Sequence, residues 1–242
     1  MLGYVRLELA RVLRDVTFLV FGVAMPTVMY LIFTTLGLAP GDGRQEVALF
    51  IMVSMAAYGG MGSAFNNGTG LGEDRATGWL RQLRLTPLSP TAVLAGKTVT
   101  GMVVVVPGIA AVLLAGVLIN DVTLRPAQWV AIVALLWLGT IPFTLFGLGN
   151  GYRLTGQSAG LANLAATMGL AVAGGLWLPI ERFPGWLKAI AQWTPTHNYA
   201  DIARHVAFGQ SPTLRSALIL LGWLLVLGMY ARYGYRYAGR RA

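Results

Sequence analysis

Long apolar runs alternate with short polar segments along almost the whole chain. Six of these runs are about 20 residues long, enough for a helix to cross a hydrocarbon core of about 30 Å. The pattern predicts an all-α membrane protein with six transmembrane helices in a single domain, residues 1–242. The expected spans are about 16–38, 47–71, 98–119, 128–149, 158–178 and 214–230.

The residues before the first run predict a helix of another kind. Within residues 1–15, Leu2, Val5, Leu9 and Val12 fall within a sector of about 100°, which is typical of an amphipathic helix lying on a membrane surface. The apolar run that follows is too long for the core of a signal peptide. We therefore expect an N-terminal interfacial helix and a retained first span, with Pro26 kinking that span.

A polar segment at 73–97 separates the second and third runs and has to leave the membrane. Trp79, Leu80 and Leu83 form a narrow apolar stripe at helical spacing, which predicts a short helix in its first half. A compact, partly apolar helix between two spans indicates a docking element. The alternative is a solvated connector.

The sequence also predicts where this short helix ends and where the next span begins. Arg81 and Arg84 share a face away from the apolar stripe, and Pro87 is expected to end the helix. Ser89 followed by Pro90 predicts the N-terminus of the next span, with Ser89 as the cap and proline at the first helical position.

A second polar segment, residues 179–213, precedes the last run and is punctuated by four prolines. It predicts two short helices, at about 183–193 and 198–208, and each is too short to span a membrane. Together they are expected to form a re-entrant hairpin that dips into one leaflet. Such a hairpin is permitted only where its backbone polar groups are satisfied within protein.

Polar side chains also occur inside two of the expected spans. The second half of 47–71 is rich in glycine and amides, and small residues let helices approach closely in lipid while buried amides need partners. We interpret these positions as a transport pathway or a dimer seam; ordinary helix packing is the alternative. The candidate residues are Asn66, Asn67, Thr69, Asn163 and Thr167.

Composition and charge support a membrane protein. The chain is 56% hydrophobic and only 11% charged, far below the roughly 25% charged residues of soluble domains. With the N-terminus inside, the segments 1–15, 73–97, 150–157 and the C-terminal tail hold 12 of the 18 basic residues. Both termini and the 73–97 segment are therefore expected to be cytoplasmic. The net charge of +9 is then explained by basic loops and tails that face anionic lipid, and nucleic-acid binding is not expected.

Several kinds of chemistry are excluded by the residues present. There is no cysteine, and no cluster of histidines and carboxylates has metal-ligand spacing, so no metal site is expected. The interiors of the expected spans lack ionisable residues, which disfavours a proton-driven carrier. Ala95-Gly96-Lys97-Thr98 resembles the end of a phosphate-binding loop, but Thr91 stands where the first glycine is required. A partner that hydrolyses nucleotide is the simplest energy source.

Two passages resemble the ABC-2 type transporter permeases, the membrane subunits of bacterial ABC exporters. The first is Glu73-Asp74-Arg75-Ala76-Thr77-Gly78-Trp79-Leu80, followed by Leu85-Thr86-Pro87-Leu88-Ser89 and Lys97. The second is Leu178-Pro179, Phe183-Pro184-Gly185-Trp186-Leu187 and Pro195-Thr196-His197-Asn198-Tyr199-Ala200-Asp201-Ile202-Ala203-Arg204. They are similar to the family's patterns between spans two and three and before the last span. With six expected spans, an N-terminal surface helix and cytoplasmic termini, the resemblance covers the whole chain.

The resemblance implies that residues 73–86 form a coupling helix seated on a separate ATP-binding subunit. Arg75 stands where many members have Glu, which affects the exact contact. The hairpin at 179–213 is implied to face outside and cap the exit. The implied coupling residues are Glu73, Arg75, Gly78, Leu80, Arg81, Arg84 and Pro87, and the implied hairpin residues are Pro184, Trp186, Pro195, Tyr199 and Arg204.

The resemblance also implies the assembly and its task. Two ATP-binding subunits bind ATP and Mg, this chain carries no cofactor and no enzymatic site, and a second permease chain, identical or paralogous, completes a pathway in the bacterial cytoplasmic (inner) membrane. The expected function is efflux of a lipophilic substrate of the drug, antibiotic or lipid type, as in multidrug resistance. The alternatives are an ion-coupled secondary carrier and a non-transporting membrane scaffold, and the sequence names neither the substrate nor the direction of transport.

Overall fold

The computed structural model describes residues 19–36, 43–76 and 90–240, and all regular structure within these ranges is helical, as predicted. The helices are η1 (Leu19–Ala24), α3 (Met25–Thr35), α4 (Arg44–Ala76), α6 (Pro90–Asn120), α7 (Pro126–Leu138), α8 (Ile141–Arg153), α9 (Gly156–Ala173), η2 (Ile180–Arg182), α10 (Gly185–Ala191), α11 (Pro195–Ala207) and α12 (Leu214–Arg240).

Helices lie at each of the six predicted spans, but they differ in length and apolarity. Within the described ranges, four are long and apolar enough to cross a membrane: Arg44–Gly72, Val99–Asn120, Pro126–Arg153 and Leu214–Arg236. The first predicted span holds a shorter apolar helix, Gly22–Thr35, and the fifth lies on α9. The count of six spans stays a prediction.

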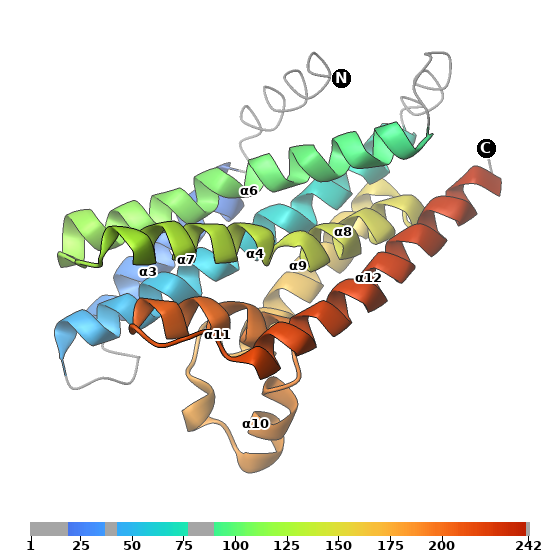
Figure 1. The fold of residues 1–242 in the computed structure, drawn as a ribbon. Coiled ribbons are helices and arrows are strands. Elements are labelled where there is room, and N and C mark those ends of the chain that lie inside the picture. Colours follow the sequence, from blue (N-terminus) through green and yellow to red (C-terminus); the bar gives the residue numbers. More distant parts are fainter. Residues whose placement is uncertain (1–18, 37–42, 77–89, 241–242) are drawn as a thin grey trace.

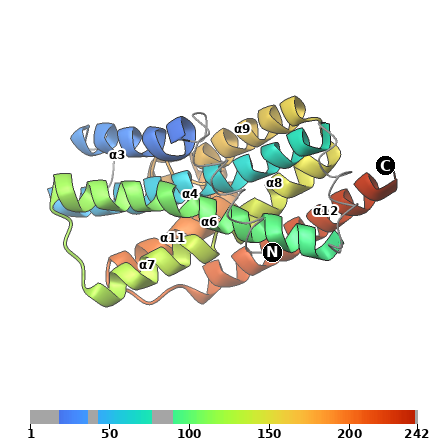
Figure 2. The same cartoon turned by 90° about the horizontal axis from the view of Figure 1, so that it is seen from above.

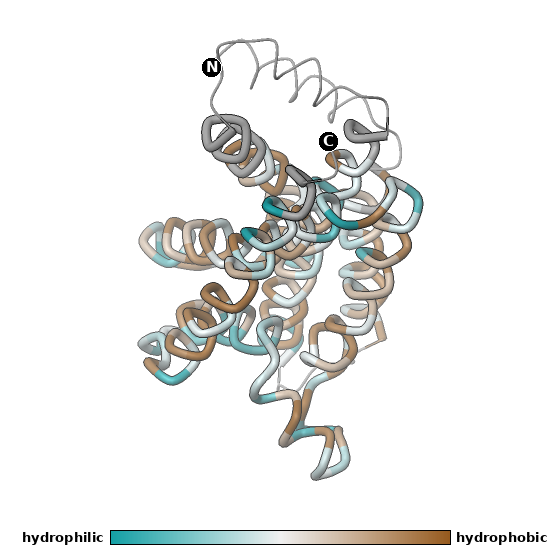
Figure 3. The backbone as a smooth tube through the Cα atoms, turned by 90° about the vertical axis from the view of Figure 1, so that its right-hand side faces the viewer, coloured by the Kyte–Doolittle hydropathy of each residue, from teal (hydrophilic) through white to brown (hydrophobic). Residues whose placement is uncertain are grey.

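Helix α4 is the core of the bundle, with α3, α6, α8, α9 and α11 packed around it (Figures 1 and 2). Of its most apolar stretch, 83% is buried, against 17% for α12 at the edge of the bundle. The outer helices carry hydrophobic segments, drawn brown in Figure 3, and their exposed side chains include Leu118, Val130 and Leu225. An apolar outer surface around a buried helix is what lipid as a solvent favours.

Prolines interrupt two of the helices. The chain changes from the π-helical η1 to α3 directly before Pro26, which was expected to kink the first span. Pro142 lies in the first turn of α8, just after the break that separates α8 from α7. Proline lacks the amide hydrogen that would continue the helical hydrogen bonds, so the predicted fourth span is two helices in succession.

The end of this fourth span differs from the prediction. Residues 150–157 were expected to be a polar link, but α8 continues to Arg153 and Asn150 is buried within it. Arg153 itself is exposed and lies over the rings of Tyr230 and Tyr233 at 5.5 and 5.6 Å. The helix continues because both polar side chains find partners on neighbouring helices.

The segment 179–213 contains two short helices with different surroundings. Helix α10 projects from the bundle, whereas α11 is enclosed by α4, α7, α9 and α12 (Figure 1). Helix α11 begins at Pro195, three residues before the predicted start, because Thr194 caps it by accepting a hydrogen bond from the His197 amide at 3.2 Å. Helix α11 is thus surrounded by protein, and the re-entrant hairpin and its depth in a membrane stay predictions.

The ends of the helices sort into two groups. The end of α4, the start of α6, the α8–α9 connection and the end of α12 lie at one end of the bundle (Figures 1 and 2). At the opposite end, the Gln45 side chain donates hydrogen bonds to the Asp121 carbonyl and the Thr123 hydroxyl in the α6–α7 turn, at 3.3 and 3.2 Å. Segments predicted to share one side of the membrane therefore share one end of the structure.

Some predictions fall outside the described residues. These are the interfacial helix at 1–15 and the coupling positions from Gly78 to Pro87. Glu73 and Arg75 belong to the last residues of α4, and α6 begins at Pro90, as Ser89-Pro90 predicted.

Glycines set the distance between α4 and α8. A Cβ atom on Gly68 would collide with the backbone of Gly147, and one on Gly151 would collide with the Gly68 carbonyl. The two helices therefore touch backbone to backbone, an approach that only glycine permits.

We expect Gly68→Ala to lower the thermal stability of the purified chain, because α4 and α8 would have to separate; overpacking of this kind costs about 1–3 kcal/mol. Gly70→Ala is the matched control, since a Cβ there meets nothing within 4 Å. Melting followed by tryptophan fluorescence in detergent compares the two. Equal melting temperatures would show that the α4–α8 contact is not tight.

Candidate functional site

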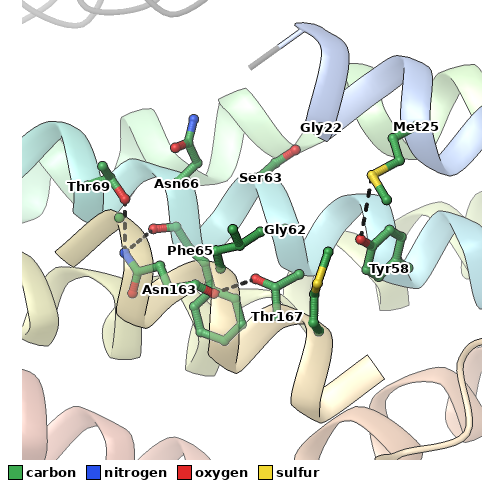
Figure 4. A pocket seen from close by; sticks show the side chains of 13 residues that line it. Gly22, Met25, Tyr58, Gly62, Ser63, Phe65, Asn66, Thr69, Asn163 and Thr167 are labelled. Carbon is green, nitrogen blue, oxygen red and sulfur yellow. Dashed lines mark hydrogen bonds between the residues drawn. The ribbon is translucent and has the colours of Figure 1, made fainter. Parts of the chain in front are cut away.

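A groove of about 230 Å³ lies between η1, α3, α4 and α9 (Figure 4). Four of the five predicted seam residues line it, whereas Asn67 lies elsewhere, with its amide against Gly101 of α6. The structure thus brings together polar positions of two separate predicted spans. The lining residues are Gly22, Met25, Tyr58, Gly62, Ser63, Phe65, Asn66, Thr69, Gly160, Asn163, Leu164, Thr167 and Met168.

Asn163 of α9 is the centre of a hydrogen-bond network at the base of the groove. It is 3% exposed, and its amide donates to the Phe65 carbonyl at 2.9 Å and to the Thr69 hydroxyl at 3.1 Å, both on α4 (Figure 4). Thr167 donates back to the Asn163 carbonyl at 2.8 Å. These bonds join α9 to α4 and satisfy a buried amide in an apolar bundle.

The network continues to two further helices. The Asn150 amide of α8 donates to the Asn163 side-chain oxygen at 2.7 Å, and the Tyr230 hydroxyl of α12 donates to the Asn150 side-chain oxygen at 2.6 Å. The sequence did not point to either residue as part of a site. Asn150 directly follows an apolar run and Tyr230 is the last residue of another, so both were assigned to the ends of spans. Asn163, Thr69 and Thr167 therefore combine helix packing with a place in the groove wall.

Two other polar residues line the groove without a hydrogen-bond partner among the described residues. Ser63 has a buried hydroxyl with no hydrogen-bond partner among the described residues, and Asn66 likewise makes no hydrogen bond to them (Figure 4). A polar atom that is buried and unpaired costs free energy, so a group that binds there and pairs with it gains that energy back. Ser63 was not among the predicted site residues.

The remaining wall is apolar and reaches the surface of the bundle. Leu164 and Met168 line the groove and are also exposed on α9. None of the lining residues carries an ionised side chain. The groove is thus suited to an apolar molecule that offers one or two hydrogen-bonding groups.

Tyr199 anchors α11 in the bundle. It is buried, and its hydroxyl donates to the Leu136 carbonyl at 2.8 Å, next to the break between α7 and α8. Burial raises the pKa of Tyr199, so the hydroxyl keeps its proton and its role as a donor. Gly139 lies directly against the Tyr199 ring, where a Cβ would collide.

The other predicted hairpin residues are spread over two environments. Pro184 and Trp186 belong to the start of α10, and Trp186 is 68% exposed, whereas Pro195 and Arg204 are buried on α11. The exposed tryptophan suits a water–lipid boundary. Pro184 and Trp186 therefore belong to a projecting surface, and Tyr199 and Arg204 to the bundle interior.

The apolar helices around a buried central helix are typical of a helical membrane protein. Comparison of its sequence with known proteins identifies the family. A family model described as "ABC-2 family transporter protein" matches residues 41–232, and the chain belongs to this family. It is also 30% identical over 231 residues to a protein of Bacillus subtilis (strain 168) whose printed name is "Putative transport permease YvfS", covering 93% of each chain. The chain is thus a transport permease subunit of the ABC-2 family.

We expect Asn163→Ala to lower the free energy of unfolding by about 1–3 kcal/mol, because it removes the partner of Asn150 and Thr69 at once. Asn66→Ala is the matched control and is expected to stay within about 0.5 kcal/mol of the wild type. Chemical denaturation in detergent measures both. Equal losses for the two variants would contradict the assignment of Asn163 as the packing centre.

Proposed function

We propose that this chain is the membrane subunit of an ATP-driven exporter that moves a lipophilic substrate, of the drug, antibiotic or lipid type, out across the bacterial cytoplasmic membrane. ATP and Mg bind to two copies of a separate subunit, and the permease crosses the membrane six times with both termini in the cytoplasm. The observation that carries the proposal is the uncharged groove on α4 and α9 of a chain that belongs to the ABC-2 family.

The shape of the groove supports a lipophilic substrate. Its exposed side, at Leu164 and Met168, faces outward from a bundle whose surface is apolar, so a molecule dissolved in lipid enters without crossing water. The half-buried side chain of Asn66 supplies hydrogen bonds that orient it. The absence of charge in the wall disfavours coupling to protons, which needs groups that titrate within the membrane.

The size of the groove supports pairing with a second permease chain. Complete ligand pockets are about 300–1,000 Å³, larger than the 230 Å³ that one chain provides. A second copy or a paralogue placed against the exposed face of α9 would close the open side. The pathway would then lie at the seam between the chains, which unites the two roles predicted for these residues.

Coupling to ATP hydrolysis is assigned to the connection between α4 and α6. Glu73 and Arg75 on the last residues of α4 continue directly into the central helix, whose other turns line the groove. A push on residues 73–86 by the ATP-binding subunit therefore reaches the groove along one rigid element. Glu73, Gly78, Leu80, Arg81 and Arg84 would carry this contact.

The coupling role is tested by purifying the chain from its native membrane in mild detergent. A stoichiometric ATP-binding subunit is expected to co-purify, and to be lost when residues 75–86 are replaced by a Gly/Ser linker of equal length. The linker keeps α4 and α6 connected, and an unchanged melting temperature shows that the bundle stays folded. An intact chain that purifies alone and moves solute under an ion gradient would establish a secondary carrier instead. One that purifies alone and moves nothing would fit a scaffold.

The groove is tested by filling it. A Cβ on Gly62 meets only the Thr167 methyl group at 3.7 Å, so Gly62→Leu fits the backbone and extends into the groove. We expect a loss of efflux of about tenfold or more, measured as restored sensitivity of an efflux-deficient host to a panel of lipophilic antibiotics. Gly222→Leu, on exposed α12 with open space around it, should leave efflux unchanged. Full efflux by the Gly62→Leu variant would show that the groove is not part of the transport pathway.

A further inference from the structure

A second cavity, of about 160 Å³, lies between α11, η2 and the first half of α4. This volume far exceeds the roughly 10–15 Å³ that one water molecule needs. In contrast to the groove, its wall is rich in ionisable groups. The lining residues are Phe50, Ile180, Glu181, His197, Asp201, Arg204, His205, Phe208 and Gln210.

Arg204 is the buried cation of this cavity. It is 8% exposed, and its guanidinium lies over the Phe50 ring, 4.8 Å from the ring centre. Among the described residues, no carboxylate oxygen lies within 4.0 Å of the guanidinium and no side-chain or backbone group accepts a hydrogen bond from it. Burial lowers the pKa of Arg204, yet arginine keeps its charge in proteins.

The guanidinium of Arg204 presents unused donors to the cavity. Its five N–H groups have no partner among the described residues, and its nitrogens keep accessible surface within the cavity. Buried charges are normally paired or hydrogen-bonded. The cavity beside Arg204 has room for an acceptor that would pair with these donors.

The two nearest carboxylates do not fill this role. Asp201 accepts a hydrogen bond from the Ser216 hydroxyl at 2.8 Å and lies 3.5 Å from the His205 ring, so it is held toward α12. Glu181 is exposed at the rim of the cavity. Both act on Arg204 only at a distance, as general negative charge.

The two histidines differ in their surroundings. Burial and the neighbouring Arg204 lower the pKa of His197 to about 4, so His197 is neutral at physiological pH. His205 is tied on both sides, with one ring nitrogen 2.9 Å from the Asp201 carbonyl and the other 3.2 Å from the Thr213 hydroxyl. Arg204 is therefore the cation of the cavity, and the carboxylates of Asp201 and Glu181 oppose it.

We propose that this cavity is a binding site for a phosphate-type oxyanion, held by the unpaired guanidinium of buried Arg204. Planar guanidinium donors match the oxygens of phosphate in pairs. The side-chain amide of Gln210 at the rim can serve a further oxygen. The ligand is either free phosphate or the headgroup of a phospholipid, and the site is separate from the uncharged groove and does not depend on the transport role.

The test follows the thermal stability of the full chain in a neutral detergent by tryptophan fluorescence. Inorganic phosphate is titrated against chloride of matched ionic strength, and dihexanoyl phosphatidylglycerol against dihexanoylglycerol, which lacks the phosphate. We expect stabilisation by at least one phosphate probe over its control. Stabilisation by inorganic phosphate identifies a free anion, and stabilisation by the phospholipid alone identifies a headgroup.

Arg204→Gln is expected to raise the half-saturating concentration about tenfold or more, since a charge-assisted pair is lost. Arg215→Gln is the matched control: it removes an arginine that lies over the Trp193 ring, outside the cavity, and should bind as the wild type does. Arg204→Lys keeps the charge and should fall between the two.

Glu181→Gln keeps the test decisive where Arg204→Gln does not fold. It changes an exposed side chain, and because it removes a negative charge from the rim, it should lower the half-saturating concentration. The proposal is overturned where neither phosphate probe stabilises the wild type beyond its control. It is equally overturned where Arg204→Gln binds as the wild type does, or where Glu181→Gln leaves binding unchanged.

Discussion

The structure depends on how closely other helices approach α4. In lipid, apolar surface gives helices no reason to associate, so close contact and buried hydrogen bonds hold the bundle together. Gly68 allows α8 to touch α4, and Gly72 does the same for α9, where a Cβ would lie 3.1 Å from the Gly156 Cα. Only at this separation does Asn163 reach the Phe65 carbonyl. The polar network is thus a consequence of the glycines.

The same stretch of α4 serves two purposes on two faces. Gly68 and Gly72 are four residues apart and face the neighbours that press against the helix. Gly62, Asn66 and Thr69 lie at i, i+4 and i+7 on another face and line the groove. Sequence reasoning left pathway and packing as alternatives for this region. The structure places the packing glycines on one face and the groove residues on the other, with Thr69 bonded to Asn163 across the two helices; a pathway stays a prediction.

The helices were predictable because their apolar runs are long and prolines and glycines mark their ends. Burial was less predictable. Asn150 reads as the start of a loop, and only its contacts with Asn163 and Tyr230, 13 and 80 residues away, show that it is internal. The composition of α11 predicts a position near a membrane boundary, but residues far away in the sequence enclose it. One of them is Gln128, whose side chain donates to the Val206 and Ala207 carbonyls. Partners this far apart along the chain leave no recognisable pattern in the local sequence.

Helix α11 also connects the break in the α7–α8 pair to the rest of the bundle. Where the helical hydrogen bonds are interrupted, bending is least costly, and the Tyr199 hydroxyl supplies a donor to Leu136 beside that break. On the other side, Thr196 donates to the Leu170 carbonyl near the end of α9 at 2.8 Å. A change in the angle between α7 and α8 therefore has to move α11, strain α9, or break one of these bonds. Because α9 forms a wall of the groove and Arg204 lies on α11, both sites are mechanically linked to the one place where the helix pair bends most easily.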